Sequence, residues 1–143
     1  MVDERRRRCR PASTAHSMRG SQPDVCIEFA RSPAAAGSVR RTLAHELDVA
    51  DDLADDVELV VSELVTNVVR HAGTDGVVEV WACPDEVRIE VHDAAAAVPH
   101  MRAAGGSGGG FGLRIVDRLA TAWGHRSSRR GKTVWAVLSA VDR

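Results

Sequence analysis

Apolar and polar positions near the start of the chain predict a strand followed by a helix. In VCIEF, residues 25–29, every second side chain is apolar, which is the period of a half-buried strand. Ser32 and Pro33 come next and supply an N-cap and a first-turn proline for a helix. One face of this helix is expected to carry Val39, Leu43 and Leu47.

A second, longer helix is predicted from the acidic stretch DDLADD onward. Asp51 or Asp52 is expected to cap the first amides and to favour the positive end of the helix dipole. The helix is expected to run to about His71 and to stop at Gly73, a suitable C′ glycine. Its apolar residues recur at helical spacing and form one stripe, made of Leu53, Val57, Val60, Leu64 and Val68.

Two alternating stretches after this helix predict a β-hairpin. Residues 77–82 read VVEVWA and residues 87–93 read VRIEVHD, with a short turn at residues 84–86. The segment that follows, residues 94–110, contains five glycines and has no periodicity, so it predicts a loop.

The last helix is predicted over residues 113–123 and the last strand over residues 133–141, with the basic turn SSRRGK between them. The order of elements is strand, two helices, hairpin, loop, helix and strand. This order predicts an α+β fold, a two-layer sandwich in which helices pack on one face of a mixed, largely antiparallel sheet. The stripe of the last helix is expected to comprise Leu113, Val116, Leu119, Ala120 and Trp123.

Length and composition narrow the class of protein. The 143 residues suit one domain, expected over residues 24–143, after a basic N-terminal tail, residues 1–23, that is predicted to be disordered. With 44% hydrophobic and 27% charged residues the composition is that of a globular protein. The net charge of −1 gives no reason to expect direct binding to nucleic acid.

The spacing of the cysteines and the hydropathy of the chain indicate the cellular compartment. The three cysteines are dispersed and lack CxxC spacing, which argues against a disulfide framework or a zinc site. No apolar run approaches the roughly 20 residues of a membrane helix, and the basic start is not followed by the apolar region of a secretory signal. The expected location is therefore the cytoplasm, with no membrane partner.

The second helix carries polar residues at an unusual spacing. Within LVVSELVTNVVRHA, Glu63, Asn67 and His71 recur at every fourth position. Glu63 and Asn67 fall on the flank of the apolar stripe, and His71 falls close to the stripe itself. The Asn67 carboxamide oxygen suits Mg²⁺ bound to phosphates, and Glu63 is suited to orient a nucleophile or accept its proton. Taken alone, this spacing is more typical of boundary residues that only bond their neighbours.

Asp93 ends the second strand of the hairpin and has the same parity as Val87, Ile89 and Val91. The register therefore points its carboxylate toward the core, where burial requires a donor. The exocyclic amino group of a purine, a backbone amide, an arginine or a serine are all suitable donors. A turn-forming aspartate at the end of a strand is the simpler alternative.

A glycine-rich stretch opens the last helix, in GGSGGGFGLRIVDRL, residues 105–119. Glycines let backbone amides approach an anion, and a helix start adds partial positive charge. The stretch is not a P-loop, because the only GK[ST] triplet, residues 131–133, leads into a strand and has Arg126 at the first glycine position. A G-x-G-x-x-G match is also absent from the loop, so the choice lies between phosphate binding and a flexible linker.

Taken in order, these three features resemble the ATP-binding domain of the gyrase, Hsp90, histidine-kinase and MutL superfamily, the Bergerat (GHKL) fold. The likeness covers about residues 24–140 and is strongest to single-domain anti-sigma-factor serine/threonine kinases of the RsbW and SpoIIAB type. SELVTNVVRHA resembles their N-box, GFGLRIVDRL their second glycine box, and GKTVW their closing strand.

The resemblance implies an Mg-ATP site. Asn67 would coordinate Mg²⁺, Glu63 would be the base that activates a partner's serine or threonine hydroxyl, and Asp93 would take the adenine amino group. The other nucleotide-binding residues implied by the resemblance are Arg70, His71, Gly108, Gly110, Gly112, Leu113 and Thr133.

The implied function is that of an ATP-binding anti-sigma factor that phosphorylates a STAS-type anti-anti-sigma factor and so regulates transcription. The implied partners are a sigma factor and the STAS-type antagonist, and homodimer formation is left open. The chain departs from the superfamily at the first glycine box, where Ala95 and Ala97 replace glycines and disfavour positive φ. One alternative is a nucleotide-dependent binding module of the same fold without phosphoryl transfer. Another, which rests on the missing glycines, is a protein that binds no nucleotide.

Overall fold

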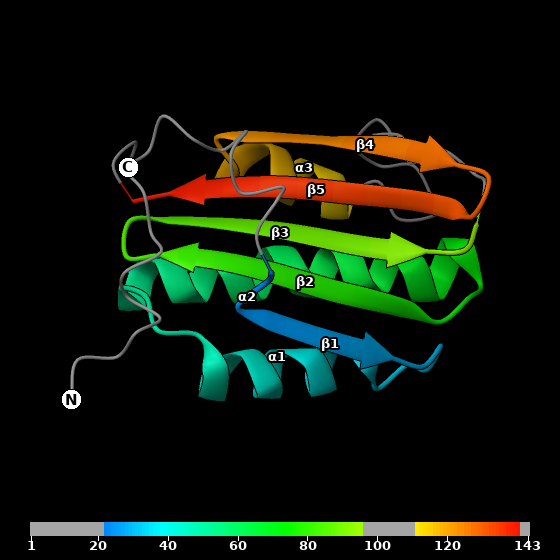
Figure 1. Cartoon of the computed structure of the whole chain (residues 1–143), viewed down its shortest axis with the longest axis horizontal. Helices are drawn as coiled ribbons and strands as arrows, with labels where there is room; N and C mark the ends of the chain where they lie inside the picture. The colour runs from blue at the N-terminus through cyan, green and yellow to red at the C-terminus, as the bar shows by residue number, and fades with distance from the viewer. Residues whose placement is uncertain (1–21, 96–110, 141–143) are drawn as a thin grey trace.

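The computed structural model describes residues 22–95 and 111–140, and in them one sheet carries the helices on a single face (Figure 1). The predicted tail, residues 1–23, and the predicted loop, residues 94–110, lie almost wholly outside the described residues. The predicted α+β two-layer sandwich is confirmed.

The sheet has five strands in the order β1-β2-β3-β5-β4. Each pair of neighbours is antiparallel, so within the described residues the sheet is antiparallel throughout rather than mixed. The predicted hairpin is present, with its turn at Pro84 and Asp85. The strand bounds are β1 Val25–Phe29, β2 Gly76–Cys83, β3 Glu86–Asp93, β4 Ala122–Ser128 and β5 Gly131–Ser139.

The first helix begins two residues later than its predicted cap implies, and the second begins one or two residues earlier. The N-cap of the first helix is Ala34 rather than Ser32, and the Ser32 hydroxyl accepts a hydrogen bond from the Ala34 amide at 3.2 Å. The N-cap of the second helix is Ala50, with Asp51 and Asp52 in its first turn, where their charge still favours the dipole. The helix bounds are α1 Ala35–Glu46, α2 Asp51–Asn67, the π-helical turn η3 Val68–Ala72, and α3 Phe111–Leu119.

The core lies between the sheet and the helices, and the predicted stripes face it. Val39 and Leu43 of α1 are buried, while Leu47 is only partly buried. All five stripe residues of the second predicted helix are buried: Leu53, Val57, Val60 and Leu64 of α2, and Val68 of η3. No helix in the described ranges is long and apolar enough to cross a bilayer.

The strand β4 was not predicted, and Trp123 belongs to it rather than to the last helix. α3 ends at Leu119, and the Thr121 amide already donates to the Val137 carbonyl of β5 at 2.8 Å. Because AWGHRSS is mostly exposed, it lacks the apolar alternation by which strands are recognised. Trp123 packs against the core from this edge strand.

Candidate functional site

One end of the sandwich gathers the chain segments that carry the predicted site residues (Figure 1). Asp93, at the end of β3, pairs with Gly76 at the start of β2 and with Lys132 at the start of β5. The end of the second helix joins them, because Thr74, just after this helix, accepts a hydrogen bond from the Ala94 amide at 3.3 Å. The C-terminal end of the N-box segment and the end of β3 are therefore linked through the Thr74 side chain.

Glu63 and Asn67 lie one turn apart on α2, and both are half-buried. Next to them Val60, Val61 and Leu64 are fully or almost fully buried and fix the helix against the core. Neither Glu63 nor Asn67 forms a side-chain hydrogen bond or ion pair with another described residue. A rigid helix thus offers a carboxylate and a carboxamide, both on the border of the core, to a ligand.

The helix widens directly after Asn67. Residues Val68–Ala72 form a π-helical turn, in which the Gly73 amide donates to the Val68 carbonyl at 3.1 Å. Gly73 adopts φ 68°, the left-handed conformation expected of a C′ glycine. The wider turn changes the direction of the side chains within it, so His71 is exposed and does not lie against the stripe. Single π-helical turns are often found at functional sites.

Asp93 is buried, as its parity predicted. It meets one donor of a predicted kind, a backbone amide, and one that was not predicted, Lys132. The side chain is fully enclosed, and Lys132 Nζ lies 2.8 Å from its Oδ2. Its Oδ1 accepts a hydrogen bond from the Ala95 amide at 2.8 Å. The sequence did contain one signal for this partner. In the last strand Lys132 has the same parity as Val134 and Ala136, so all three side chains face the core.

The structure does not bring Thr133 together with Asp93. Thr133 is paired with His92 in the β3–β5 register, so both point to the face of the sheet away from the helices. There the Thr133 hydroxyl lies 2.7 Å from His92 Nδ1. The residue that shares the face of Asp93 is its neighbour Lys132.

The remaining predicted residues divide into two groups. Arg70 and His71 are exposed on η3, where their predicted contact with phosphates stays a prediction. Leu113 is buried in the core, so only its backbone is available to a ligand. Gly112 lies in the first turn of α3. Gly108 and Gly110 lie outside the described residues.

Close packing at Gly131 fixes the position of Lys132. Gly131 has φ +136°, and a Cβ built there would overlap the Asp93 carbonyl oxygen and lie 2.7 Å from the Ala94 Cα. A side chain at this position is therefore excluded both by its backbone conformation and by the neighbouring strand. Glycine lets β5 approach the end of β3 closely enough for the Asp93–Lys132 pair to form.

Gly131→Ala is accordingly expected to lower the free energy of unfolding by about 1–3 kcal/mol, measured by urea titration followed by tryptophan fluorescence. Gly37→Ala is the matched control, because Gly37 lies in α1 and its Cβ would meet only the ends of arginine side chains. That change is expected to raise the stability by about 0.5–1 kcal/mol. Equal midpoints for Gly131→Ala and the wild type would contradict the close approach.

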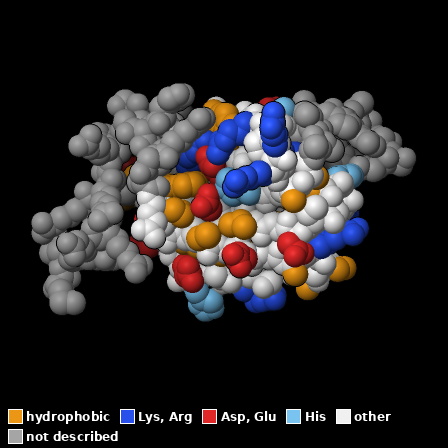
Figure 2. Space-filling view, turned by 45° about the vertical axis from the view of Figure 1, so that its right-hand side comes forward, with side chains coloured by type: hydrophobic (Ala, Val, Ile, Leu, Met, Phe, Trp, Pro, Cys, Tyr) orange, Lys and Arg blue, Asp and Glu red, His pale blue; other side chains and the backbone are white. Residues whose placement is uncertain are grey.

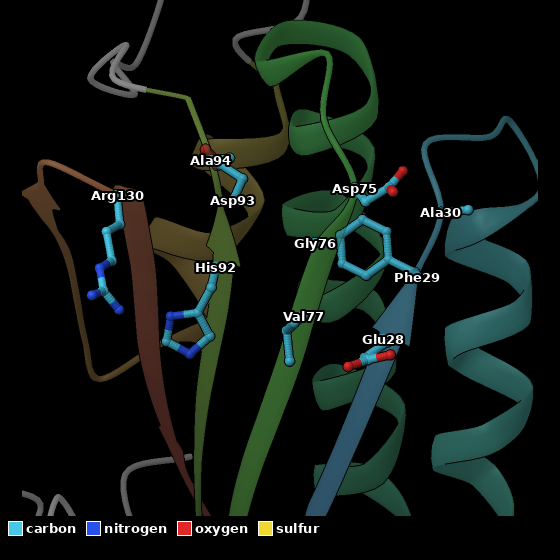
Figure 3. A pocket seen from close by; sticks show the side chains of 10 residues that line it. All are labelled: Glu28, Phe29, Ala30, Asp75, Gly76, Val77, His92, Asp93, Ala94 and Arg130. Carbon is cyan, nitrogen blue, oxygen red and sulfur yellow. The ribbon is translucent and has the colours of Figure 1, made fainter.

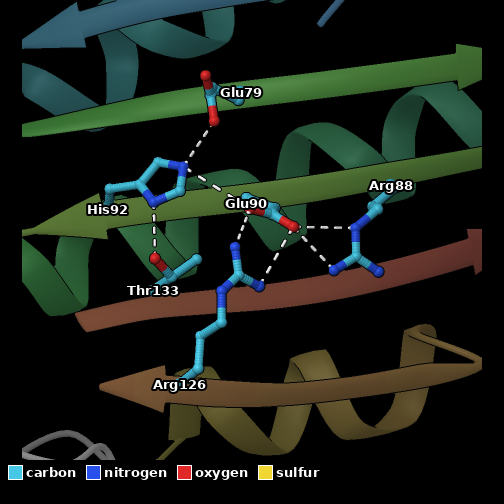
Figure 4. Close-up of polar contacts among 6 residues, drawn as sticks. All are labelled: Glu79, Arg88, Glu90, His92, Arg126 and Thr133. Carbon is cyan, nitrogen blue, oxygen red and sulfur yellow. Dashed lines mark hydrogen bonds and ion pairs between the residues drawn. The ribbon is translucent and has the colours of Figure 1, made fainter. Parts of the chain in front are cut away.

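The outer face of the sheet carries a network of ion pairs (Figure 4). Arg88 and Arg126 both hold the Glu90 carboxylate, with shortest contacts of 2.8 Å and 2.6 Å. His92 bridges the Thr133 hydroxyl and Glu79, whose Oε2 lies 2.7 Å from His92 Nε2. This link across three strands depends on the register of the sheet, so the sequence alone does not reveal it.

Glu90 is the centre of this network. Burial raises the pKa of its carboxyl group, but hydrogen bonds and charges from Arg126 and Arg88 outweigh burial and leave the pKa below its ordinary value. Ligand atoms of Glu79, Glu90 and His92 lie within 4.8 Å of one another, a spacing that a metal ion would fit. Since both Glu90 oxygens already accept from guanidinium groups, the cluster is better described as an ion-pair network.

A pocket of about 490 Å³ opens beside Asp93 (Figure 3), a size in the range of small-molecule sites. Its lining comes from the end of β1, the start of β2, the end of β3 and the β4–β5 turn. His92 and Arg130 bring nitrogen atoms to it, and Glu28 and Asp75 bring carboxylates. A ligand-sized space therefore adjoins the chain at Asp93.

Basic side chains lie on the surface around the turn that joins β4 to β5. Arg126, Arg129 and Arg130 are exposed there. The space-filling view shows Lys and Arg side chains gathered over one part of the surface, with acidic side chains spread below them (Figure 2). The chain as a whole carries a net charge of −1, so the excess of positive charge is local to this part of the surface. Such a patch would favour phosphates or an acidic partner surface.

Fold and site together define a class of protein, an ATP-binding domain of the GHKL type. They combine an antiparallel sheet covered by helices, a helix with ExxxN on its flank, and a buried aspartate at the end of the adjacent strand. The chain belongs to the histidine kinase-like ATPase domain family, whose family model matches residues 29–138.

Among solved structures, the chain is similar to the histidine kinase domain of the E. coli osmosensor EnvZ, determined by NMR. The identity is 16% and the TM-score 0.44, over 83% of this chain and 90% of that one. No curated protein matches the sequence.

Proposed function

We propose that this protein is an anti-sigma factor that uses ATP to phosphorylate a serine or threonine of a STAS-type anti-anti-sigma factor, and that it regulates transcription in this way. The observation that carries the proposal is the pair Glu63 and Asn67, half-buried one turn apart on a rigid helix. The family of this chain includes RsbW-type anti-sigma factors, which supports the proposal.

The residues at this end of the molecule fit Mg-ATP. The Asn67 carboxamide would hold Mg²⁺, which when bound neutralises charge on the phosphates. Arg70 and His71 would face the phosphates from η3, and Asp93 Oδ2 would meet the base. This oxygen is buried and lies 2.8 Å from Lys132 Nζ, and its second lone pair can accept from an incoming amino group.

Glu63 would then act on the substrate protein. Its carboxylate would accept the proton of the serine or threonine hydroxyl and so direct that oxygen at the phosphate. Because α2 is fixed by the buried residues around Glu63, the carboxylate would be positioned without first having to order a loop.

A nucleotide-dependent binding module without phosphoryl transfer is the second candidate. The Ala95 amide donates to Asp93 Oδ1, so the chain turns tightly where the superfamily has glycine. If this turn prevents the productive arrangement of phosphates, ATP would change only which partner surface is presented.

Transfer of label separates the two candidates. The full chain is incubated with γ-labelled Mg-ATP and STAS-domain proteins from the same genome, and serine and threonine phosphorylation is read by autoradiography and mass spectrometry. Label on one STAS protein is expected. Saturable binding of ATP without transfer to any of them would favour the binding module, and absence of nucleotide binding would exclude both.

Asn67→Ala is expected to weaken Mg-ATP binding by at least about tenfold, because it removes a hard oxygen ligand of Mg²⁺. Binding is measured by isothermal titration with and without Mg²⁺. Thr66→Ala is the control, since Thr66 is also half-buried but points in a different direction on the helix. Equal affinity of Asn67→Ala and wild type in the presence of Mg²⁺ would remove Asn67 from the site.

A further inference from the structure

The Asp93–Lys132 pair is an ion pair inside an otherwise apolar face. The side chains of Asp93 and Lys132 are 0% and 8% exposed, and their strand neighbours on the same face are Val91 and Val134. Taking each charge out of water costs several kcal/mol, and apolar residues in place of such a pair are often at least as stabilising. Stability alone therefore does not explain why two charges occupy this position.

The two carboxylate oxygens of Asp93 have different partners. Oδ1 accepts the Ala95 amide at 2.8 Å. Oδ2 lies 2.8 Å from Lys132 Nζ, the distance of a charge-assisted hydrogen bond, and receives no other hydrogen bond within the described part of the chain. A carboxylate oxygen has two lone pairs and an ammonium group three donors, so each side retains capacity for a ligand.

Asp93 Oδ2 and Lys132 Nζ lie side by side, so they present a hydrogen-bond acceptor next to a donor. The Watson–Crick edge of adenine presents the matching order, with the exocyclic amino group as donor and ring nitrogen N1 as acceptor. An ammonium group can only donate, whereas a hydroxyl or a water molecule at the same place can also accept. Lys132 would therefore demand an acceptor at the ring position beside the amino group.

We propose that Lys132 reads the base together with Asp93: Nζ donates to N1 of adenine while Asp93 Oδ2 accepts from the amino group. This inference rests on the proposed nucleotide site and adds to it a residue that determines base specificity. Because Oδ2 is enclosed, the base reaches it only after the atoms that cover it have moved.

Wild-type full-length protein is titrated with Mg-ATP and with Mg-1-deaza-ATP, in which N1 is replaced by C–H. A hydrogen bond from a charged group is lost, so the analogue is expected to bind about 10–100-fold more weakly. In Lys132→Met the two nucleotides are expected to bind with nearly equal affinity. Arg40→Met, which removes an exposed positive charge from α1, should keep the wild-type preference.

The outcomes are distinct. Equal binding of both nucleotides by wild type, or tighter ATP binding by Lys132→Met, would overturn the inference and identify Lys132 as a plug that the base displaces. Mg-GTP binding as tightly as Mg-ATP would overturn it as well. If no nucleotide binds, both this inference and the proposed function are wrong. If Lys132→Met does not fold by circular dichroism, the wild-type comparison alone decides.

Discussion

Replacing Glu63 with Gln is expected to slow phosphoryl transfer to the STAS substrate by about 10²–10⁴-fold, the usual contribution of a general base. Gln preserves the size of the side chain and its half-buried position on α2, but it cannot accept a proton. Affinity for Mg-ATP is expected to stay close to that of wild type, because Glu63 is assigned to the substrate hydroxyl and not to the nucleotide. Single-turnover transfer of label and equilibrium titration with Mg-ATP measure the two quantities separately.

Asp55→Asn is the matched control for this change. Asp55 is an exposed carboxylate on the same helix, two turns before Glu63, so its loss alters the charge of α2 without touching the site. Transfer by Asp55→Asn should equal that of wild type. If Glu63→Gln transfers phosphate as fast as wild type, Glu63 is not the base; if it loses ATP binding instead, its role lies in holding the nucleotide.

The part of the site on α2 could be predicted from the sequence because a long, strongly periodic helix fixes the direction of each side chain. Glu63 and Asn67 fall beside the Leu and Val stripe at any reasonable helix boundaries, and both are half-buried. The prediction failed after Asn67, where the π-helical turn breaks the 3.6-residue period and turns His71 to solvent. Nothing in the local pattern VVRHA indicates this change.

Contacts that depend on strand register could not be predicted in the same way. Parity alone sent Asp93 to the core, but its partner Lys132 follows only from the pairing of β3 with β5. The strand β4 has few apolar residues and lies at the edge of the sheet, so its pairing with β5 defines it, not its own pattern. Once β4 is in place, it brings Arg126 to Glu90.

The Glu90 network supports the largest stability prediction. Glu90→Gln is expected to lower the free energy of unfolding at pH 7 by about 3–5 kcal/mol, because it leaves Arg88 buried without its carboxylate. The Arg88 and Glu90 side chains are only 4% and 5% exposed, and the Arg88 guanidinium lies 4.9 Å from the centre of the Trp135 ring. Urea unfolding followed by tryptophan fluorescence measures the loss.

Two variants separate a lost charge pair from a general loss of packing. Glu79→Gln changes an acid on the same face that is 28% exposed and that, among the described residues, pairs with His92 alone, so it is expected to cost less than about 1 kcal/mol. The double change Arg88→Met with Glu90→Leu removes both buried charges and is expected to recover most of the stability lost in Glu90→Gln. A double variant as unstable as Glu90→Gln would contradict this explanation.

The dependence on pH has a definite sign. The pKa of Glu90 is lower in the folded protein than in the unfolded chain, since the arginine contacts outweigh burial. Its stabilisation is therefore fully present above the unfolded value, about 4.3, and is lost as the pH falls through the folded value. The difference in unfolding free energy between wild type and Glu90→Gln should be constant from pH 7 to about pH 5 and shrink below about pH 4. A difference that stays constant in acid would show that the ionised carboxylate is not what holds Arg88 and Arg126.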